Sequence, residues 1–180
     1  MYEVDSLDVV VELRDAPRPD VGAPLPMLLC DEHHLLLAYL VSEPDPAWDG
    51  SYVTMVSPES EGMAVACVRF KWPSAHMFGP PNDEAFSGHP LADRGLHPYA
   101  VFEVRNSSWI RKLERMNSVH PQHNRERFHD GIRHFVFAFH DSTFECIADG
   151  FQVEVMRGSM RSALNHMTRQ LSERPGLTSG

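Results

Sequence analysis

The chain has 180 residues, of which 42% are hydrophobic, and its formal net charge at pH 7 is −9. A chain of this length can bury a core without disulfides or metals, and this composition excludes wholesale disorder, so we expect one domain over 1–180. So acidic a chain is also a poor general binder of nucleic acid, because contacts to phosphate need positive charge.

The first half of the sequence predicts short strands that are separated by proline-rich loops. Alternating or continuous apolar residues mark the strands, and prolines mark the loops at 16–26 and 42–50. The predicted strands cover 7–13, 27–30, 35–41, 52–56 and 63–70. The second and third of these form a hairpin through Asp31-Glu32-His33-His34.

Residues 72–98 interrupt this pattern with five prolines, three glycines and three histidines. So long a structureless segment is uncommon inside a domain and is often functional. A strand is expected over 99–104, and the capping residues that follow it predict a helix over 107–118. A second helix is expected over 159–173, before a loose tail that begins at about 175.

Residues 133–156 support the most specific structural prediction. Phenylalanines alternate with smaller residues over 133–140, Asp149-Gly150 is typical of a two-residue hairpin, and Asp141-Ser142 is a less specific turn. With both turns, strands over 133–140, 143–148 and 151–156 form an antiparallel meander. We therefore expect an α+β fold that is predominantly antiparallel β-sheet, as a sandwich, a curved sheet or a partly open barrel, with two helices.

The two turns also determine which side chains face each other. Phe139 would face Phe144, Phe137 would face Cys146 and Phe135 would face Ala148 across the first turn, whereas Cys146 would face Val153 and Phe144 would face Val155 across the second. The expected buried face therefore consists of Phe135, Phe137, Phe139, Phe144, Cys146, Val153 and Val155. A slip by one residue would turn all of these side chains to the opposite face.

On the opposite face, this register makes Glu145 and Glu154 direct cross-strand neighbours, with His140 one diagonal away. Like charges in such positions are destabilising unless water, a protonated carboxyl, an arginine or a cation relieves them. The group is therefore a candidate for an acid–base pair or a divalent metal. The alternative is an ordinary solvated sheet face.

A further candidate catalytic residue is His89, because Gly88-His89-Pro90 can hold a histidine on a rigid turn as a general base. A plain turn is the alternative. The sequence contains no phosphate-binding loop, no dinucleotide-binding motif and no Gly-x-Ser-x-Gly. The histidine and cysteine spacings do not define a metal site, so no cofactor is predicted.

Basic residues are concentrated in the second half of the chain. Residues 1–68 contain 2 basic and 13 acidic residues, whereas 69–180 contain 14 basic and 12 acidic residues. The candidate ligand-binding residues of this half are Arg111, Arg115, His120, His123, Arg133 and His134. Such a group could bind a carboxylate or a phosphate; alternatively, it is a solvated helix face, or the two halves complement each other within the fold or across a homodimer.

The three cysteines, Cys30, Cys67 and Cys146, are widely spaced and lie beside apolar residues, so we expect buried, reduced thiols. The longest apolar run, 35–41, is far shorter than the roughly 20 residues that cross a bilayer. The N-terminal residues also lack the pattern of a secretory signal. These features favour a cytoplasmic protein without a membrane partner.

These observations favour a binding or regulatory domain whose partner is a small anionic molecule or a protein. The alternative is a small enzyme that uses histidine and carboxylate groups, with or without a divalent metal. A structural subunit whose acidic first half contacts a basic partner is a third hypothesis.

Overall fold

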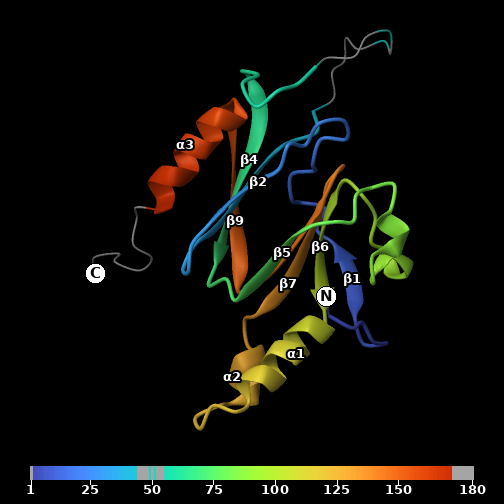
Figure 1. Ribbon diagram of the computed structural model, residues 1–180, viewed down its shortest axis with the longest axis vertical. Coiled ribbons are helices and arrows are strands. Elements are labelled where there is room, and N and C mark those ends of the chain that lie inside the picture. Colours follow the sequence, from blue (N-terminus) through green and yellow to red (C-terminus); the bar gives the residue numbers. More distant parts are fainter. Residues whose placement is uncertain (1, 44–48, 50, 52–54, 172–180) are drawn as a thin grey trace.

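Nine strands form two antiparallel sheets in the part of the chain that the computed structural model describes, residues 2–43, 49, 51 and 55–171 (Figure 1). In spatial order, the first sheet contains β1 (Val9–Glu12), β6 (Ala100–Arg105), β7 (Arg133–Ala138), β8 (Thr143–Ala148) and β5 (Ala75–Gly79). The second contains β2 (Met27–Cys30), β3 (Leu35–Leu40), β4 (Met63–Lys71) and β9 (Gly150–Gly158). Both sheets have two free edges, so neither closes into a barrel.

Within the described residues, three α-helices accompany the sheets, which confirms the predicted α+β class. They are α1 (Ser108–Asn117), α2 (Arg125–His129) and α3 (Met160–Leu171), and the single 3-10 turns η1 (Phe86–Gly88) and η2 (Ala92–Arg94) lie before β6. The predictions over 107–118 and 159–173 match α1 and α3, although residues beyond 171 lie outside the described part. The short α2 was not predicted. None of the described helices is long and apolar enough to cross a membrane.

The inner faces of the two sheets pack against each other through aromatic side chains. Phe137 from the first sheet contacts Phe70 from the second, with ring centroids 5.7 Å apart, and Tyr39 from the second sheet lies 5.4 Å from Phe139. The Tyr39 hydroxyl, which would otherwise be an unpaired buried donor, donates to the Pro17 carbonyl at 2.7 Å. Phe144 completes this inter-sheet core.

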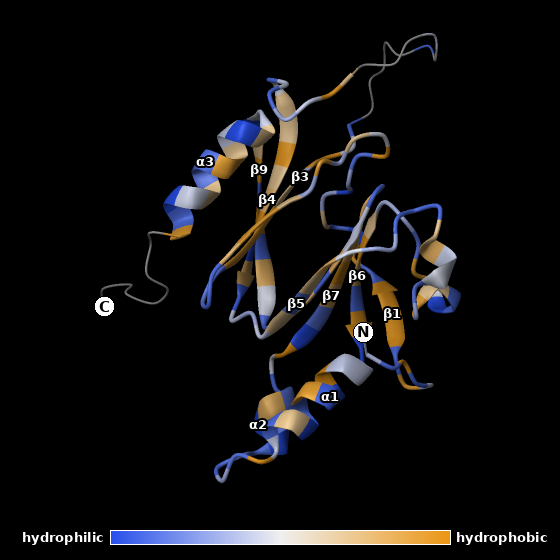
Figure 2. Ribbon diagram, in the orientation of Figure 1, coloured by the Kyte–Doolittle hydropathy of each residue, from blue (hydrophilic) through white to orange (hydrophobic). Residues whose placement is uncertain are grey.

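The outer faces of both sheets are covered as well. On the first sheet, Val136 and Ile147 pack with Trp109 of α1. On the second, Leu36 and its neighbours pack against α3, whose buried residues include Met167. The helices that cover the sheets carry both hydrophobic and hydrophilic residues (Figure 2), as expected when one helical face contacts a sheet. Central strands are therefore buried on both faces, which explains why 133–140 lacks a regular alternation of apolar and polar residues.

The first hairpin of the predicted meander forms, but with a shifted register. Phe137 pairs with Phe144 and Phe135 pairs with Cys146, two residues from the predicted partners. The connection is a longer loop, in which the Phe139 N–H donates to the Ser142 carbonyl at 2.9 Å. Because a shift by two residues preserves the face of every side chain, the phenylalanines are still buried, as predicted.

The second predicted hairpin is wrong. Strand β9 does not pair with β8; it crosses to the second sheet and pairs with β4 over nine residues, from Gly150 opposite Lys71 to Gly158 opposite Met63. Val153 and Val155, predicted to be buried, are 38% and 52% exposed on this edge strand. The physical reason is that β5 occupies the edge of β8 that β9 was expected to take.

Strand β5 lies within the segment 72–98, for which the sequence shows no periodicity. Its residues pair antiparallel with β8, from Ala75 opposite Ile147 to Gly79 opposite Thr143. The remainder of the segment contains the two 3-10 turns, and its Phe86 and Leu91 pack on the outer face of the first sheet. A strand predicted over 52–56 is absent at Met55 and Val56, and its other residues lie outside the described part.

All three cysteines are free thiols, as predicted, although Cys30 is exposed. Burial raises the pKa of the Cys67 thiol to about 11 and raises that of Cys146 well above its usual value. We therefore expect Ellman's reagent to modify Cys30 alone in the native protein and all three cysteines in denaturant. Rapid modification of Cys67 or Cys146 without denaturant, or a change in melting temperature on adding reductant, would contradict this expectation.

Candidate functional site

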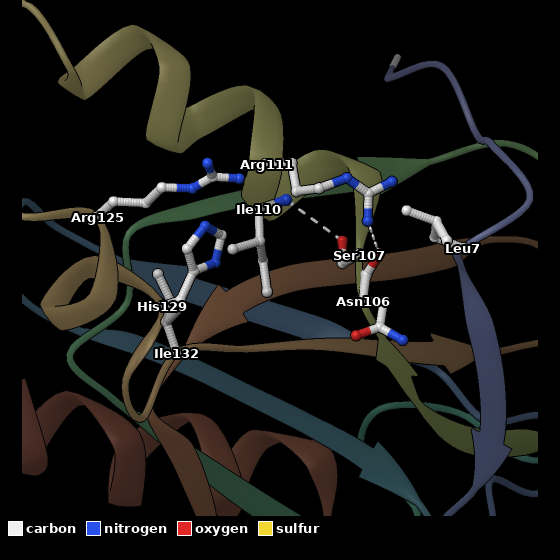
Figure 3. Close-up of a pocket in the computed structure, with 8 residues that line it drawn as sticks. All are labelled: Leu7, Asn106, Ser107, Ile110, Arg111, Arg125, His129 and Ile132. Carbon is white, nitrogen blue, oxygen red and sulfur yellow. Dashed lines mark hydrogen bonds between the residues drawn. The ribbon is translucent and has the colours of Figure 1, made fainter.

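A pocket of about 490 Å³ lies between the start of α1 and α2 (Figure 3). Residues from the N-terminal segment, from the β6–α1 turn and from α2 contribute to it. Its lining consists of Leu7, Asn106, Ser107, Ile110, Arg111, Arg125, His129 and Ile132. The pocket therefore combines three basic side chains with an apolar wall.

The turn between β6 and α1 determines the position of Ser107. Asn106 adopts a left-handed conformation with φ 51°, which is uncommon outside glycine and turns the chain sharply after β6. Ser107 is the N-cap of α1, and its Oγ accepts the Ile110 N–H at 3.3 Å. The partial positive charge at the start of a helix therefore lies beside the pocket.

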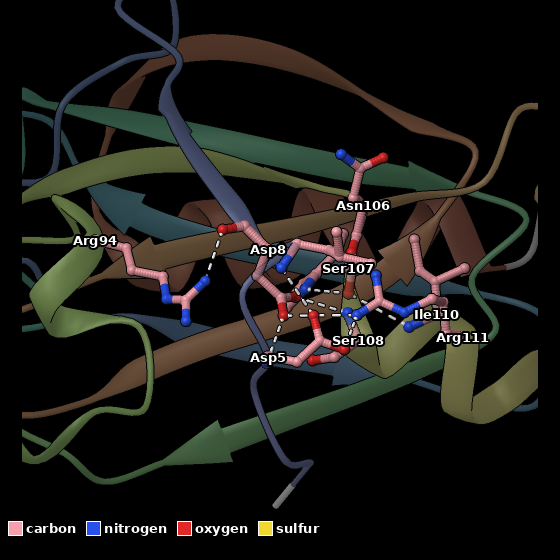
Figure 4. A network of polar contacts seen from close by, with 10 residues as sticks. Asp5, Asp8, Arg94, Asn106, Ser107, Ser108, Ile110 and Arg111 are labelled. Atoms are coloured by element: carbon pink, nitrogen blue, oxygen red, sulfur yellow. Dashed lines mark hydrogen bonds and ion pairs between the residues drawn. The ribbon is translucent and has the colours of Figure 1, made fainter.

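The N-terminal segment is attached to the start of α1 by a network of polar contacts (Figure 4). The buried Asp8 carboxylate accepts the Ser108 N–H at 2.6 Å and the Asp5 N–H at 3.0 Å. Arg111 forms an ion pair with Asp5 at 2.5 Å and lies 3.8 Å from Asp8. The Leu7 N–H and the Arg111 guanidinium both lower the pKa of the Asp5 carboxyl. These contacts position Arg111 at the rim of the pocket.

The other two basic residues, Arg125 and His129, belong to α2. The side chain of Asn124 caps this short helix by accepting the Arg127 N–H at 2.8 Å. Figure 3 shows Arg125 and His129 extending toward the first turn of α1. Within the described residues, neither side chain forms a hydrogen bond or an ion pair. The hydrogen bond from His123 and the charges of Arg125 and His129 lower the pKa of the Glu114 carboxyl, so an anion in the pocket would be a second acidic partner for the two α2 side chains.

Behind the pocket, Ser107 begins a chain of buried hydrogen bonds. Ser107 Oγ lies 2.9 Å from His134 Nδ1, and His134 Nε2 lies 2.9 Å from Glu145 Oε2. The Tyr2 hydroxyl donates to the same carboxylate oxygen at 2.6 Å, and His89 Nε2 lies 3.2 Å from Glu145 Oε1. All five side chains are buried. One carboxylate thus accepts three hydrogen bonds in the interior.

The ionisation of Glu145 results from two opposing effects. Burial raises the pKa of its carboxyl. The hydrogen bonds from His134 and His89, together with the charge of these two residues, lower the same pKa by a larger amount, so the pKa of Glu145 is about 2. Burial and the adjacent carboxylate raise the pKa of the Tyr2 phenol far above its usual value. At neutral pH the centre of the network is therefore a carboxylate that accepts from a neutral phenol.

The structure separates the four residues that the sequence suggested for catalysis. Glu145 and His89 are in contact, but Glu154 lies on β9 in the other sheet, is exposed, and is 3.4 Å from His166 of α3. The predicted pairing of Glu145 with Glu154 is therefore wrong, for the same reason as the second hairpin. His140 lies apart from Glu145, with its Nδ1 2.9 Å from Asp83 Oδ2 and 2.9 Å from the Tyr99 hydroxyl.

The predicted ligand-binding residues are also divided. Arg111 lines the pocket and His134 lies behind it, whereas Arg115 lines a neighbouring pocket with Lys112. The remaining three lie elsewhere: His120 and His123 follow α1, where His123 Nε2 is 2.8 Å from Glu114, and Arg133 is exposed at the start of β7.

Sequence reasoning missed four residues of this site: Ser107, Tyr2, Arg125 and His129. The sequence indicated Ser107 only as one of the capping residues before the helix over 107–118, and Arg125 only as one of the basic residues of the second half of the chain. Tyr2 has no sequence signal, because it reaches Glu145 across 143 positions of the chain. In the described residues, no group of three or more His, Cys, Asp or Glu side chains is arranged to hold a metal ion.

No protein family, curated protein or solved structure matches this chain. The fold and the site define a two-sheet α+β protein with a basic pocket at the start of α1. A functional conclusion therefore depends on the geometry of this pocket.

Proposed function

We propose that this protein binds a small anionic ligand in the pocket between α1 and α2, as a binding or regulatory domain. The observation that carries the proposal is the convergence of Arg111, Arg125 and His129 on one pocket, in a chain whose net charge is −9.

The three basic residues have distinct roles in this proposal. Arg111 is oriented by Asp5, so its guanidinium loses little freedom when a ligand binds. Arg125 is exposed and has no ion-pair partner among the described residues, so it can form a bidentate contact with a carboxylate or phosphate. His129 adds a donor and, when protonated, a charge.

The pocket also limits the size and shape of the ligand. Its volume of about 490 Å³ lies within the range of about 300–1,000 Å³ that is typical of small-molecule sites. Leu7, Ile110 and Ile132 give it an apolar wall. We therefore expect a ligand with one anionic group and a short apolar body.

Replacing Arg125 by alanine tests the proposal. We expect inorganic phosphate and a short-chain carboxylate such as butyrate to raise the melting temperature of the wild-type protein, because a ligand that binds the native state stabilises it. In the Arg125→Ala variant, the dissociation constant measured by calorimetry should rise about 10-fold, which corresponds to about 1.4 kcal/mol.

Arg127→Ala is the matched control, since Arg127 is exposed on the same helix but does not line this pocket. It removes the same charge from the same helix, so a general electrostatic effect would weaken binding in both variants. Equal weakening, or the absence of any stabilisation by either anion, would refute the proposed pocket.

A further inference from the structure

We propose that Ser107, His134 and Glu145 form an acyl-transfer relay, and that the protein hydrolyses small anionic esters in this pocket. The inference rests on the binding function proposed above and adds a reaction to it. It assigns the nucleophile to Ser107, the general base to His134 and the orienting carboxylate to Glu145.

The hydrogen bonds assign these roles. The Glu145 carboxylate can only accept, so the neutral His134 ring carries its proton on Nε2 and donates it across the 2.9 Å contact. The lone pair then lies on Nδ1, which faces Ser107 Oγ at 2.9 Å and can accept its proton. The two ring nitrogens are exchanged relative to the common serine triad, but each has the same chemical role.

Aromatic packing and further hydrogen bonds hold the base in this orientation. The Tyr2 and Trp109 rings stack at 5.3 Å, and each meets the His134 ring edge-on, at 5.4 and 5.2 Å. Tyr2 and His89 each donate a hydrogen bond to Glu145, which prevents the carboxylate from rotating away from His134. A general base that is fixed in this way needs no reorganisation when it accepts a proton.

The position of Ser107 is also suited to a nucleophile. It lies at a strand–turn–helix junction, as nucleophilic serines do in hydrolases that carry Gly-x-Ser-x-Gly, although that motif is absent here and the left-handed residue of the turn is Asn106. The Ile110 N–H and the N-terminal end of α1 both stabilise negative charge on Oγ. Ser107 is only 2% exposed but lines the pocket, so a substrate in the pocket can contact its Oγ.

The reaction balances with water as the only co-reactant. Ser107 Oγ bonds to the ester carbonyl carbon as its proton passes to His134 Nδ1, and negative charge develops on the carbonyl oxygen near the N-terminal end of α1, while Arg111 and Arg125 hold the anionic group of the ester. Collapse of this intermediate breaks the carbon–oxygen bond, and the leaving alcohol takes the proton from His134. Water, deprotonated by His134, then releases the acid from acyl-Ser107 and restores the hydroxyl.

A covalent probe tests the nucleophile in the unmodified protein. We expect a fluorophosphonate to phosphonylate the wild-type chain and tandem mass spectrometry to place the adduct on Ser107. The anionic ester mono-4-nitrophenyl succinate should be hydrolysed, and Ser107→Ala should lower kcat/KM at least 100-fold. Ser108→Ala is the matched control, because the Ser108 Oγ is buried without a hydrogen-bond partner, and this change should alter the rate less than twofold.

The outcomes separate this inference from the binding proposal. One outcome is that phosphate binding depends on Arg125, but the probe does not label Ser107 and the wild-type turnover does not exceed that of Ser107→Ala. In that case Ser107 is only a helix cap, and this inference fails while the binding proposal stands. If Ser107 is labelled and hydrolysis proceeds equally well in Arg125→Ala, the nucleophile is supported and the anion site is wrong. Because labelling uses the wild-type chain, a Ser107→Ala variant that fails to fold does not affect the test.

Discussion

Replacing Glu145 by alanine is expected to lower the free energy of unfolding at pH 7 by about 3–5 kcal/mol, as for other buried charges that lose their partner. The reason is that the change leaves the donors of Tyr2, His89 and His134 without an acceptor in the interior, where water does not replace it. Urea unfolding followed by circular dichroism measures the loss.

Glu154→Ala is the control for this prediction. Glu154 was paired with Glu145 in the sequence-based hypothesis, but it is exposed on β9, where it lies opposite Cys67 and 3.4 Å from His166. Its removal should therefore change the free energy of unfolding by less than about 0.5 kcal/mol. Comparable losses in the two variants would show that Glu145 is not the centre of a buried network.

The acid sensitivity of the fold provides a second measurement of the same residue. The pKa of Glu145 is about 2 in the folded protein, below its ordinary 4.5. A lowered pKa stabilises the folded state at pH values above the unfolded pKa, and this contribution is lost as the pH falls from 4.5 toward 2. It amounts to about 3 kcal/mol, so the wild-type stability should fall more steeply across this interval than that of Glu145→Gln.

Phe137→Ala is expected to destabilise the fold by about 3–5 kcal/mol, through lost burial and a residual cavity. The Phe137 ring is fully buried and lies 5.7 Å from Phe70 and 5.6 Å from Phe151, which both belong to the second sheet. Its removal thus weakens the contact between the two sheets. Guanidinium unfolding of the two proteins measures the difference.

Phe78→Ala removes the same ring at the edge of the first sheet, where the side chain is 41% exposed. We expect a loss of only about 1 kcal/mol from this change, because less apolar surface leaves water on folding. If Phe78→Ala destabilised the protein as much as Phe137→Ala, the aromatic core between the sheets would not be the main stabilising contact.

Local pattern was sufficient to predict which residues form most elements and that the phenylalanine face of the first hairpin is buried. Phe135 and Phe137 alternate with the two-residue period of a strand. The register differs from the prediction by two residues, so these side chains still lie on the predicted face. The helix over 107–118 was predictable for a similar reason, since its cap and its apolar spacing lie within a few residues of each other.

The partner of β9 was not predictable from its local sequence. Asp149-Gly150 indicates a reversal of the chain, but a chain that reverses can pair with the preceding strand or cross to another sheet. The outcome depended on β5, which takes the edge of β8, and on β4, which pairs with β9 over nine residues. Both competitors are distant in sequence, so no local signal could decide between the two pairings.

The candidate site was likewise predictable from the sequence only in part. The sequence by itself identified Glu145, His89, His134 and Arg111 as candidate functional residues. Their side-chain types and their neighbours in the sequence were sufficient for this. Only the tertiary structure decided that Glu145 contacts His89, 56 positions away, and Tyr2, 143 positions away, instead of Glu154. Side-chain chemistry is a property of the residue, whereas proximity is a property of the packed sheets, and spacing along the chain does not encode it.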